Sequence, residues 1–264
     1  MNRVDNIIIG FGKAGKTLAG YLGSKGEKTV LVEKSPLMYG GTCINVGCIP
    51  SKFLATAADR RSFSGESDAE YYKNAVLQKK ALIAKLNKVN YDKVASNENV
   101  EVLDGLASFK DEHTVQVTNG SEVSEVYAER IFVNTGARPF IPSVPGLEVG
   151  RRVHTSETLM NLEEFPKSLA ILGSGFIGLE FAASYAKFGT KVTIIDQGDR
   201  ILPREDEDVA KEVFSSYQAM GVDFLLHAAL NQVSQDEKAV HLSYTVNGEK
   251  KELSVEAFLV ATGR

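Results

Sequence analysis

The chain has 264 residues, of which 43% are hydrophobic and 24% are charged, and its formal net charge is −4. This composition is typical of a soluble globular chain with room for about two domains. The small negative charge provides no basic surface for nucleic acid or for an anionic membrane. We therefore expect a small-molecule partner, and neither nucleic acid nor a membrane.

The chain begins with a short apolar run, Ile7–Ile9, that leads into a glycine loop without a small-residue cleavage site. This pattern is not that of a signal peptide. The segment 168-SLAILGSGFIGLEFAASYA-186 is long and mostly apolar. A membrane span there would bury Glu180, and its first residues favour a strand, a loop and a helix instead. We expect a cytoplasmic protein without a transmembrane helix.

The first predicted element is a strand that runs into 10-GFGKAGKTLAG-20, and this loop fits two phosphate-binding patterns. Gly10-x-Gly12-x-x-Gly15 is the dinucleotide fingerprint, whereas Gly10-x4-Gly15-Lys16-Thr17 is a complete P-loop. Both patterns place backbone N–H groups and a helix N-terminus against phosphate. The glycines alone therefore leave a flavin or nicotinamide enzyme and a nucleoside triphosphatase as alternatives.

An internal repeat separates these alternatives. Residues 6–34 and 169–197 align without a gap, which places the three glycines on Gly173, Gly175 and Gly178. Each copy predicts a strand, a glycine turn, a helix of about ten residues and a second strand. The second copy has Leu179 and Glu180 where the first has Lys16 and Thr17. Because the shared architecture does not need the Lys-Thr pair, the repeat favours two dinucleotide turns.

Each copy also ends in an acid. Glu33 lies 18 residues after Gly15, and Asp196 lies 18 residues after Gly178. This is close to the spacing of about 20 residues expected for a carboxylate that accepts from ribose hydroxyls. A carboxylate at Asp196 accepts from a free ribose 2′-OH and repels a 2′-phosphate, and no arginine occupies the next two positions. We predict NADH as the preferred nucleotide, with NADPH as the alternative.

The two cysteines of the chain lie in 39-YGGTCINVGCIPSK-52. Thr42 or Cys43 is predicted to begin a helix that Pro50 kinks or ends, so the helix dipole should lower the pKa of Cys43. Cys-x4-Cys is not a usual zinc spacing, and no histidine lies nearby in the sequence. We therefore expect no metal site. Two dinucleotide folds and a close dithiol predict a redox relay.

The rest of the chain supplies the supporting elements. Residues 69–95 have apolar residues at helical spacing, and their lysines predict a solvated face. Residues 100–118 and 123–134 alternate as strands around a turn at Asn119-Gly120. Prolines mark a linker over 138–152, and a second meander is expected over 222–260 with a turn at Asn247-Gly248.

These motifs resemble the class I pyridine nucleotide-disulfide oxidoreductases, such as lipoamide dehydrogenase, glutathione reductase and mercuric reductase. The segment GGTCINVGCIPSK carries the resemblance, and further matches are 135-TGARP-139, 156-SETLMNLEEFPKSLAILGSGFIGLEFA-182 and 261-ATGR-264. Within the family, GFGKAGKT, MYGGTCIN and 202-LPRED-206 are most similar to the bacterial reactive-chlorine-resistance flavoproteins. That branch is similar to hypothiocyanous acid reductases.

The resemblance implies an α/β fold of two Rossmann-like, three-layer domains, each with a small β-meander. Residues 1–150 would bind FAD and carry the redox disulfide, and residues 151–264 would bind the nicotinamide nucleotide. A C-terminal dimerisation domain is expected to be absent, with a homodimer expected for the full-length form. The resulting alternative is a dinucleotide-binding fragment with weak FAD retention and little turnover.

The resemblance also assigns roles to individual residues. Cys43 is implied to be the thiol that meets substrate, Cys48 the thiol against the flavin, and Lys52 the partner of Glu180 near the flavin. The residues implied for FAD are Gly10, Gly12, Gly15, Glu33, Lys34, Gly41, Thr42, Lys52, Ala107, Thr135, Gly136 and Ala137. Those implied for the nicotinamide nucleotide are Gly173, Gly175, Ile177, Gly178, Glu180, Asp196, Val233 and Gly263.

The implied reaction passes hydride from NAD(P)H through FAD to the Cys43–Cys48 disulfide. The reduced pair would then reduce an electrophile, either an oxidant like hypothiocyanous acid or a disulfide. Lipoamide and mercuric ion are the alternative acceptors.

Overall fold

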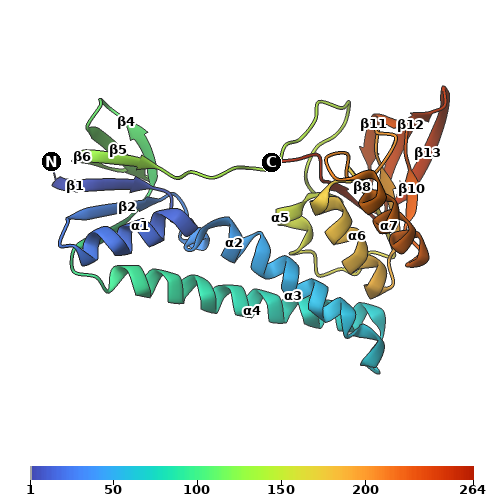
Figure 1. Ribbon diagram of the computed structural model, residues 1–264, viewed down its shortest axis with the longest axis horizontal. Helices are drawn as coiled ribbons and strands as arrows, with labels where there is room; N and C mark the ends of the chain where they lie inside the picture. The colour runs from blue at the N-terminus through green and yellow to red at the C-terminus, as the bar shows by residue number, and fades with distance from the viewer. Residues whose placement is uncertain (1) are drawn as a thin grey trace. The chain divides into compact units, whose positions relative to one another are not determined.

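The computed structural model describes residues 2–264, which divide into two compact units (Figure 1). The first unit comprises residues up to Pro50 together with Lys80–Ala137, and the second comprises Ser51–Lys79 and Arg138–Arg264. Both units are α/β, as the sequence predicts.

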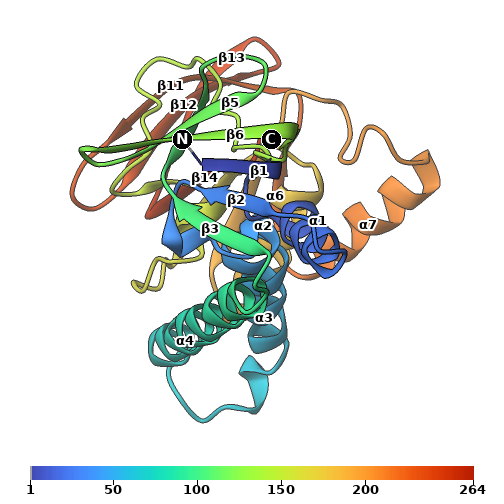
Figure 2. The same cartoon turned by 90° about the vertical axis from the view of Figure 1, so that its left-hand side faces the viewer.

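The first unit is built on a six-stranded sheet in the order β3-β2-β1-β6-β5-β4 (Figure 2). The strands β3, β2, β1 and β6 are parallel, whereas β4, β5 and β6 form an antiparallel meander. β6 belongs to both parts because its first half pairs with β5 and its second half with β1. The bounds are β1 (Asn2–Ile9), β2 (Thr29–Glu33), β3 (Val100–Asp104), β4 (Leu106–Phe109), β5 (Thr114–Asn119) and β6 (Glu122–Val133).

The faces of this sheet follow from the alternation of side chains along each strand. Ile8 packs with residues of α1 (Lys13–Ser24) and α4 (Asp68–Ala95), whereas Ile7 packs with the meander. Both side chains are fully buried, and each burial contributes about 1.5–3 kcal/mol. The result is three layers: helices, parallel sheet and meander.

The second unit repeats this plan. Its parallel sheet has the order β10-β9-β8-β14-β7, and a separate antiparallel sheet has the order β11-β12-β13. The bounds are β7 (Val153–Thr155), β8 (Ser168–Leu172), β9 (Lys191–Ile195), β10 (Asp223–Leu225), β11 (Ala228–Gln235), β12 (Val240–Val246), β13 (Glu249–Val255) and β14 (Ala257–Val260).

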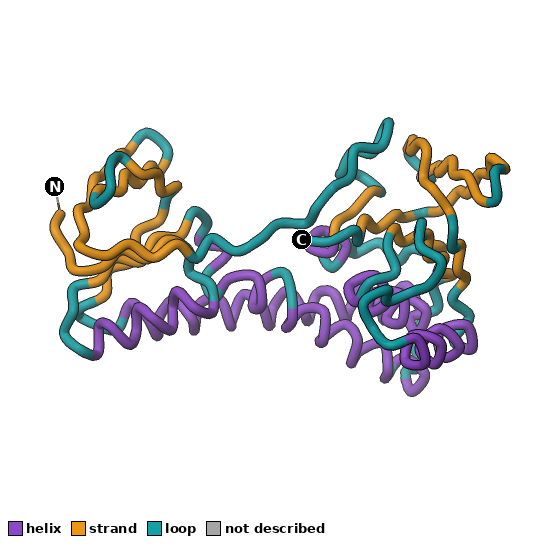
Figure 3. The backbone as a smooth tube through the Cα atoms, turned by 45° about the horizontal axis from the view of Figure 1, so that its top comes forward, coloured by secondary structure: helices purple, strands orange, loops and turns teal. Residues whose placement is uncertain are grey.

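Helices cover one face of each unit's sheet, as Figure 3 shows by the separation of purple from orange. In the second unit, Leu169 and Ile171 of β8 pack against the helical layer, whereas Ala170 and Leu172 pack against the meander. The remaining helical segments are η1 (Pro36–Met38), α2 (Gly41–Asn45), α3 (Cys48–Asp59), η2 (Arg61–Phe63), α5 (Ser156–Leu159), α6 (Phe176–Phe188) and α7 (Glu207–Ala219).

The two compact units do not meet at a single boundary at residue 150, which is where the sequence predicts a division of the chain. The Tyr72 hydroxyl lies 2.8 Å from that of Tyr185, which joins α4 to α6 inside the second unit. The Val233 N–H donates to the Pro145 carbonyl at 2.9 Å, which joins the predicted linker to β11. Residues 51–79 and 138–150 therefore complete the core of the second unit. The assignment of one cofactor to each half of the chain remains a prediction.

Several predicted elements are present. The helix over 69–95 is α4, and the apolar segment 168–186 is β8, a glycine turn and most of α6. Across residues 2–264, no helix is long and apolar enough to cross a membrane. The turn at Asn247-Gly248 is confirmed, with positive φ at both residues.

Three expectations about the same segments are wrong in detail. β5 runs through Asn119, so the first turn lies one residue later than predicted. β3, β10 and β14 join the parallel sheets, because their backbones pair with neighbouring parallel strands rather than with the meanders. Lys79 does not belong to a solvated face, because it is 2% exposed and donates to the Met160 carbonyl at 2.6 Å.

Candidate active site

The first glycine turn is shaped by close backbone contacts. Gly10 has φ +110°, and a Cβ there would lie 2.2 Å from the Asn134 carbonyl oxygen. A Cβ on Gly15 would lie 2.1 Å from the Gly10 oxygen. α1 begins after Gly12 with no side-chain cap and no acid in its first turn. Its first N–H groups and its dipole therefore favour a bound phosphate.

Glu33 closes the same turn from the end of β2. Its Oε2 accepts from the Phe11 N–H at 3.0 Å, and its Oε1 accepts from the Ser35 N–H at 3.3 Å. The side chain is 8% exposed. Each carboxylate oxygen has a further lone pair, so Glu33 can hold the loop and also accept from a ribose hydroxyl.

The second glycine turn has the same construction. A Cβ on Gly173 would lie 2.6 Å from the Ala261 oxygen, and one on Gly178 would lie 2.1 Å from the Gly173 oxygen. Asp196 Oδ2 accepts from the Ser174 N–H at 2.7 Å, as Glu33 accepts from Phe11. The helix behind the turn, α6, again has no side-chain cap and no acid in its first turn. The sequence repeat is thus a repeat of hydrogen-bond geometry.

A second repeat, which sequence reasoning missed, completes each turn. The pairs Thr135-Gly136 and Thr262-Gly263 each follow a strand that lies beside the first strand of its unit, β6 and β14 respectively. In each case the residue before the Thr-Gly pair has the carbonyl oxygen that an added Cβ on the first glycine of the turn would meet. The recurrence of Thr-Gly after an apolar strand was the signal that could have revealed this equivalence.

A cleft of about 670 Å³ opens at the second glycine turn. Of the predicted nicotinamide residues, it is lined by Gly173, Gly175, Ile177, Asp196 and Gly263. It is also lined by residues that the prediction did not include, among them Ser174, Phe176, Arg204 and Arg264. Ser174 is a direct partner of Asp196, because its Oγ donates to Oδ2 at 2.6 Å.

Three predicted nicotinamide residues lie outside the lining of this cleft. Gly178 is buried in α6 behind the turn, and Glu180 lines a neighbouring cleft. The Val233 side chain is 2% exposed in the core between sheet and meander, because a register shift in β11 between Leu230 and Gln232 turns it inward. A nucleotide contact for Val233 remains a prediction.

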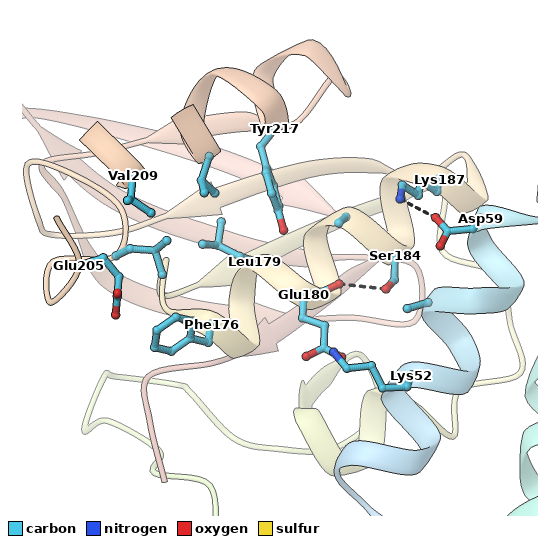
Figure 4. Close-up of a pocket in the computed structure, with 14 residues that line it drawn as sticks. Lys52, Asp59, Phe176, Leu179, Glu180, Ser184, Lys187, Glu205, Val209 and Tyr217 are labelled. Atoms are coloured by element: carbon cyan, nitrogen blue, oxygen red, sulfur yellow. Dashed lines mark hydrogen bonds and ion pairs between the residues drawn. The ribbon is translucent and has the colours of Figure 1, made fainter. Parts of the chain in front are cut away.

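The predicted pair of Lys52 and Glu180 is present. Lys52 Nζ lies 2.9 Å from Glu180 Oε1, and Figure 4 shows the two side chains pointing toward one another from α3 and α6. They line a cleft of about 500 Å³ with Phe176 and Tyr217. Burial and the Glu180 charge raise the pKa of Tyr217. Since Lys52 is 69% exposed, the pair adds little stability, and its effect is to orient the lysine.

The cysteines lie on two helices, which corrects the predicted start of one helix at Thr42 or Cys43. α2 spans only Gly41–Asn45, and Cys48 begins α3. Pro50 lies in the first turn of α3, where proline costs no hydrogen bond, so it does not break the helix.

The predicted lowering of the Cys43 pKa is also wrong. The side-chain hydrogen bond with Cys48 and burial raise the pKa of Cys43, and the charge of Lys16 opposes them. Cys48 is exposed and is the residue at a longer helix's N-terminus.

The other predicted FAD residues lie in the first unit. Gly41 packs against the first turn, because its Cβ would lie 2.5 Å from the Gly12 Cα. Thr42 follows on α2, and Ala107 is half-buried on β4. Lys34 is exposed next to Glu33, and Thr135, Gly136 and Ala137 follow β6. Contacts of these residues with FAD remain predictions. Within the described residues, no cluster of three or more His, Cys, Asp and Glu side chains could hold a metal ion.

Comparison with known proteins agrees with this geometry. The family model described as pyridine nucleotide-disulphide oxidoreductase matches residues 4–264. The chain belongs to this family. Its members are oxidoreductases that use FAD and a pyridine nucleotide. The fold of both units, with uncapped glycine turns and a strand-terminal acid, fits these two dinucleotides.

Two relatives place the chain within the family. It is 40% identical to the probable pyridine nucleotide-disulfide oxidoreductase RclA of Escherichia coli. The match covers 100% of this chain and 57% of the relative. It is 32% identical to dihydrolipoyl dehydrogenase of Geobacillus stearothermophilus, covering 98% of this chain and 56% of the relative. The chain thus spans little more than half the length of these relatives.

A solved structure of RclA is also similar to this chain. It is described as the Cu(II) complex of the HOCl-induced flavoprotein disulfide reductase RclA from Escherichia coli. The TM-score is 0.92 at 40% identity, covering 100% of this chain and 57% of that one. The predicted resemblance to the reactive-chlorine-resistance branch is confirmed.

Proposed function

We propose that the chain is the dinucleotide-binding and dithiol part of an enzyme that reduces an electrophilic small molecule with electrons from NADH. The observation that carries this proposal is the hydrogen-bonded pair of Cys43 and Cys48 in a chain with two glycine turns of the same construction. FAD, when bound, supplies the two-electron carrier between nicotinamide nucleotide and the cysteine pair.

The residues have separate tasks in this proposal. The first turn, with Gly12 and Glu33, holds the FAD pyrophosphate and ribose, and the second turn with Asp196 holds the nicotinamide nucleotide. Glu180 orients Lys52 across a 2.9 Å ion pair. Cys48 is the thiol on the flavin side, and Cys43 is the thiol that attacks substrate.

The acceptor is an electrophile that a thiolate can attack. The Cys43 thiolate attacks the electrophilic sulfur of the acceptor and displaces its leaving group. Cys48 then attacks the Cys43 sulfur, which forms the disulfide and releases the reduced product. The HOCl-induced relative supports an oxidant such as hypothiocyanous acid, released as thiocyanate. The dihydrolipoyl dehydrogenase relative supports a disulfide such as lipoamide as the second candidate.

The test uses the full-length protein under anaerobic conditions. It is titrated with NADH and then offered hypothiocyanous acid, lipoamide, glutathione disulfide and mercuric ion in turn. Cys43→Ser and Cys48→Ser should each abolish reduction of the preferred acceptor while ferricyanide reduction by NADH continues. Unchanged acceptor reduction in Cys43→Ser would refute the proposal. The same preparation tests the expected homodimer by its mass in solution.

We expect a preference for NADH because of the hydrogen bonds that the Asp196 carboxylate makes within the chain. Oδ2 accepts twice from Ser174, and Oδ1 accepts from the Gly198 N–H at 2.8 Å. These bonds fix the position of the Asp196 side chain, whose negative charge repels a 2′-phosphate. Steady-state kinetics should give a higher kcat/KM for NADH than for NADPH.

A matched pair of variants sharpens the nucleotide test. Asp196→Asn should reduce the preference by about tenfold or more, because it removes the negative charge. Arg204→Met should leave it within about twofold, because the preference does not depend on that cation. A wild-type preference for NADPH that disappears in Arg204→Met would show that arginine rather than Asp196 selects the nucleotide.

A further inference from the structure

Lys16 is the residue of the P-loop-like motif to which the proposed function gives no task. It lies in the first turn of α1, where its N–H donates to the Gly12 carbonyl at 3.0 Å. Its side chain is half-buried, and Nζ donates to Asn90 Oδ1 on α4. The lysine is therefore directed toward α4 and away from free solvent.

The same face of α4 holds the cysteine segment. Asn90 Cγ lies 3.3 Å from the position of a Cβ on Gly40, the residue before α2. One turn earlier, Asn87 Nδ2 donates to Asn45 Oδ1 at 3.1 Å, at the end of α2. Residues three apart share one face of a helix. Asn87 and Asn90 therefore contact both ends of the helix that carries Cys43, and Asn90 also binds Lys16.

A second contact joins the start of α1 to the start of α2. Gly41 packs so tightly that an added Cβ would lie 2.5 Å from the Gly12 Cα. Lys16 is one helical turn from this contact on α1, and Cys43 is two residues from it on α2. The lysine and the thiol thus lie near one junction that α4 closes.

The charge of Lys16 favours an anion at Cys43. Burial and the neighbouring Lys13 and Lys93 lower the pKa of Lys16, whereas a charge on Cys43 raises it. Lys16 in turn lowers the pKa of Cys43, against the opposing effects of Cys48 and burial. Lys16 is thus the cation whose charge favours a thiolate at Cys43.

We propose that Lys16, held by Asn90, is a positioning cation that stabilises the Cys43 thiolate. The inference deepens the proposed function, in which Cys43 is the attacking thiol. It assigns the lysine of the glycine motif to the dithiol instead of to a nucleotide phosphate.

The test measures the thiol itself in the reduced full-length protein. The alkylation rate of Cys43 by iodoacetamide is followed against pH by peptide-resolved mass spectrometry. Lys16→Met should slow alkylation at pH 7 by about three- to tenfold and move the midpoint of the pH profile upward, because one pKa unit is a tenfold change in thiolate. Lys16→Arg should restore the rate to within about twofold by retaining the charge.

Lys13→Met is the matched control, since Lys13 is exposed in the same turn of α1 and should leave the rate within about twofold. If Lys16→Met does not fold, Lys16→Gln replaces it, because its amide can still donate to Asn90. An unchanged pH profile in a folded Lys16→Met or Lys16→Gln variant overturns the inference.

The two proposals fail separately. A shifted alkylation profile in an enzyme that reduces none of the acceptors sinks only the proposed function. If Cys43→Ser loses turnover but the pH profile of Cys43 alkylation is unshifted in Lys16→Met, only the proposed role of Lys16 is refuted.

Discussion

At the scale of single residues, buried polar groups show where burial changes chemistry. His154 on β7 is 7% exposed, and its Nε2 has no hydrogen-bond partner among the described residues. Its Nδ1 lies 3.5 Å from the Thr158 hydroxyl. Burial, with the nearby Arg152 charge, lowers the pKa of His154 to about 4. The folded protein therefore holds this imidazole neutral at pH 7.

This depressed pKa predicts a loss of stability in acid. In the unfolded chain, a histidine with a pKa of about 6.5 binds a proton at a pH where the folded His154 remains neutral. The contribution of His154 to the free energy of unfolding is therefore fully present above about pH 6.5 and is lost as the pH falls toward 4. The free energy of unfolding should fall by about 2 kcal/mol from pH 7 to pH 5 through this group. Urea denaturation at both pH values measures it. His154→Leu should remove that part of the pH dependence, and an unaltered slope would contradict the assignment.

At the scale of elements, helix beginnings distinguish the dinucleotide turns from ordinary helices. α1 and α6 begin at glycines without an acid in the first turn, whereas α7 has two acids there, Glu207 and Asp208. Acids at a helix N-terminus satisfy the dipole from within the chain. Their absence from α1 and α6 leaves both positive ends for a ligand's phosphate.

The junction of α1 and α2 gives a prediction at this scale. Gly41→Ala should lower the free energy of unfolding by about 1–3 kcal/mol or more, because Gly41 has φ +73° and its Cβ would lie 2.5 Å from the Gly12 Cα. Gly20→Ala is the control, since Gly20 lies within α1 with open space around a Cβ. It should stabilise by about 0.5–1 kcal/mol. Equal effects in chemical denaturation would argue against a tight junction.

At the scale of the whole molecule, one plan occurs twice, and each copy is expected to serve a different dinucleotide. In each unit, helices cover one face of the parallel sheet and a meander covers the other. The two turns differ in their neighbours, because α2 with Cys43 packs against the first turn, whereas Arg204 lines the cleft at the second.

The two copies can be separated by mutating one glycine in each. Gly175→Val should fold normally, because open space surrounds a Cβ there, but it should raise the Kd for NADH at least about tenfold and leave FAD content unchanged. Gly12→Val should instead lower FAD content. Within the chain its Cβ would meet only the flexible Asn134 side chain, at 3.1 Å, so the added side chain should interfere with FAD rather than with folding. Flavin absorbance per chain and NADH titration of the full-length protein measure both. Loss of FAD in Gly175→Val would contradict one cofactor for each turn.

The amino-acid sequence by itself determined the features that depend on local backbone chemistry. Gly10 and Gly15 are required because a Cβ at either would meet backbone oxygens, whereas Gly12 is expected to leave room for the phosphates. The acids at Glu33 and Asp196 follow from a strand of fixed length after each turn. Tertiary structure decided the rest. Lys16 meets Asn90 across 74 positions, Cys48 rather than Cys43 begins the longer helix, and residues 51–79 join the second unit. These outcomes depend on which distant surfaces bury one another, and a local pattern holds no record of that packing.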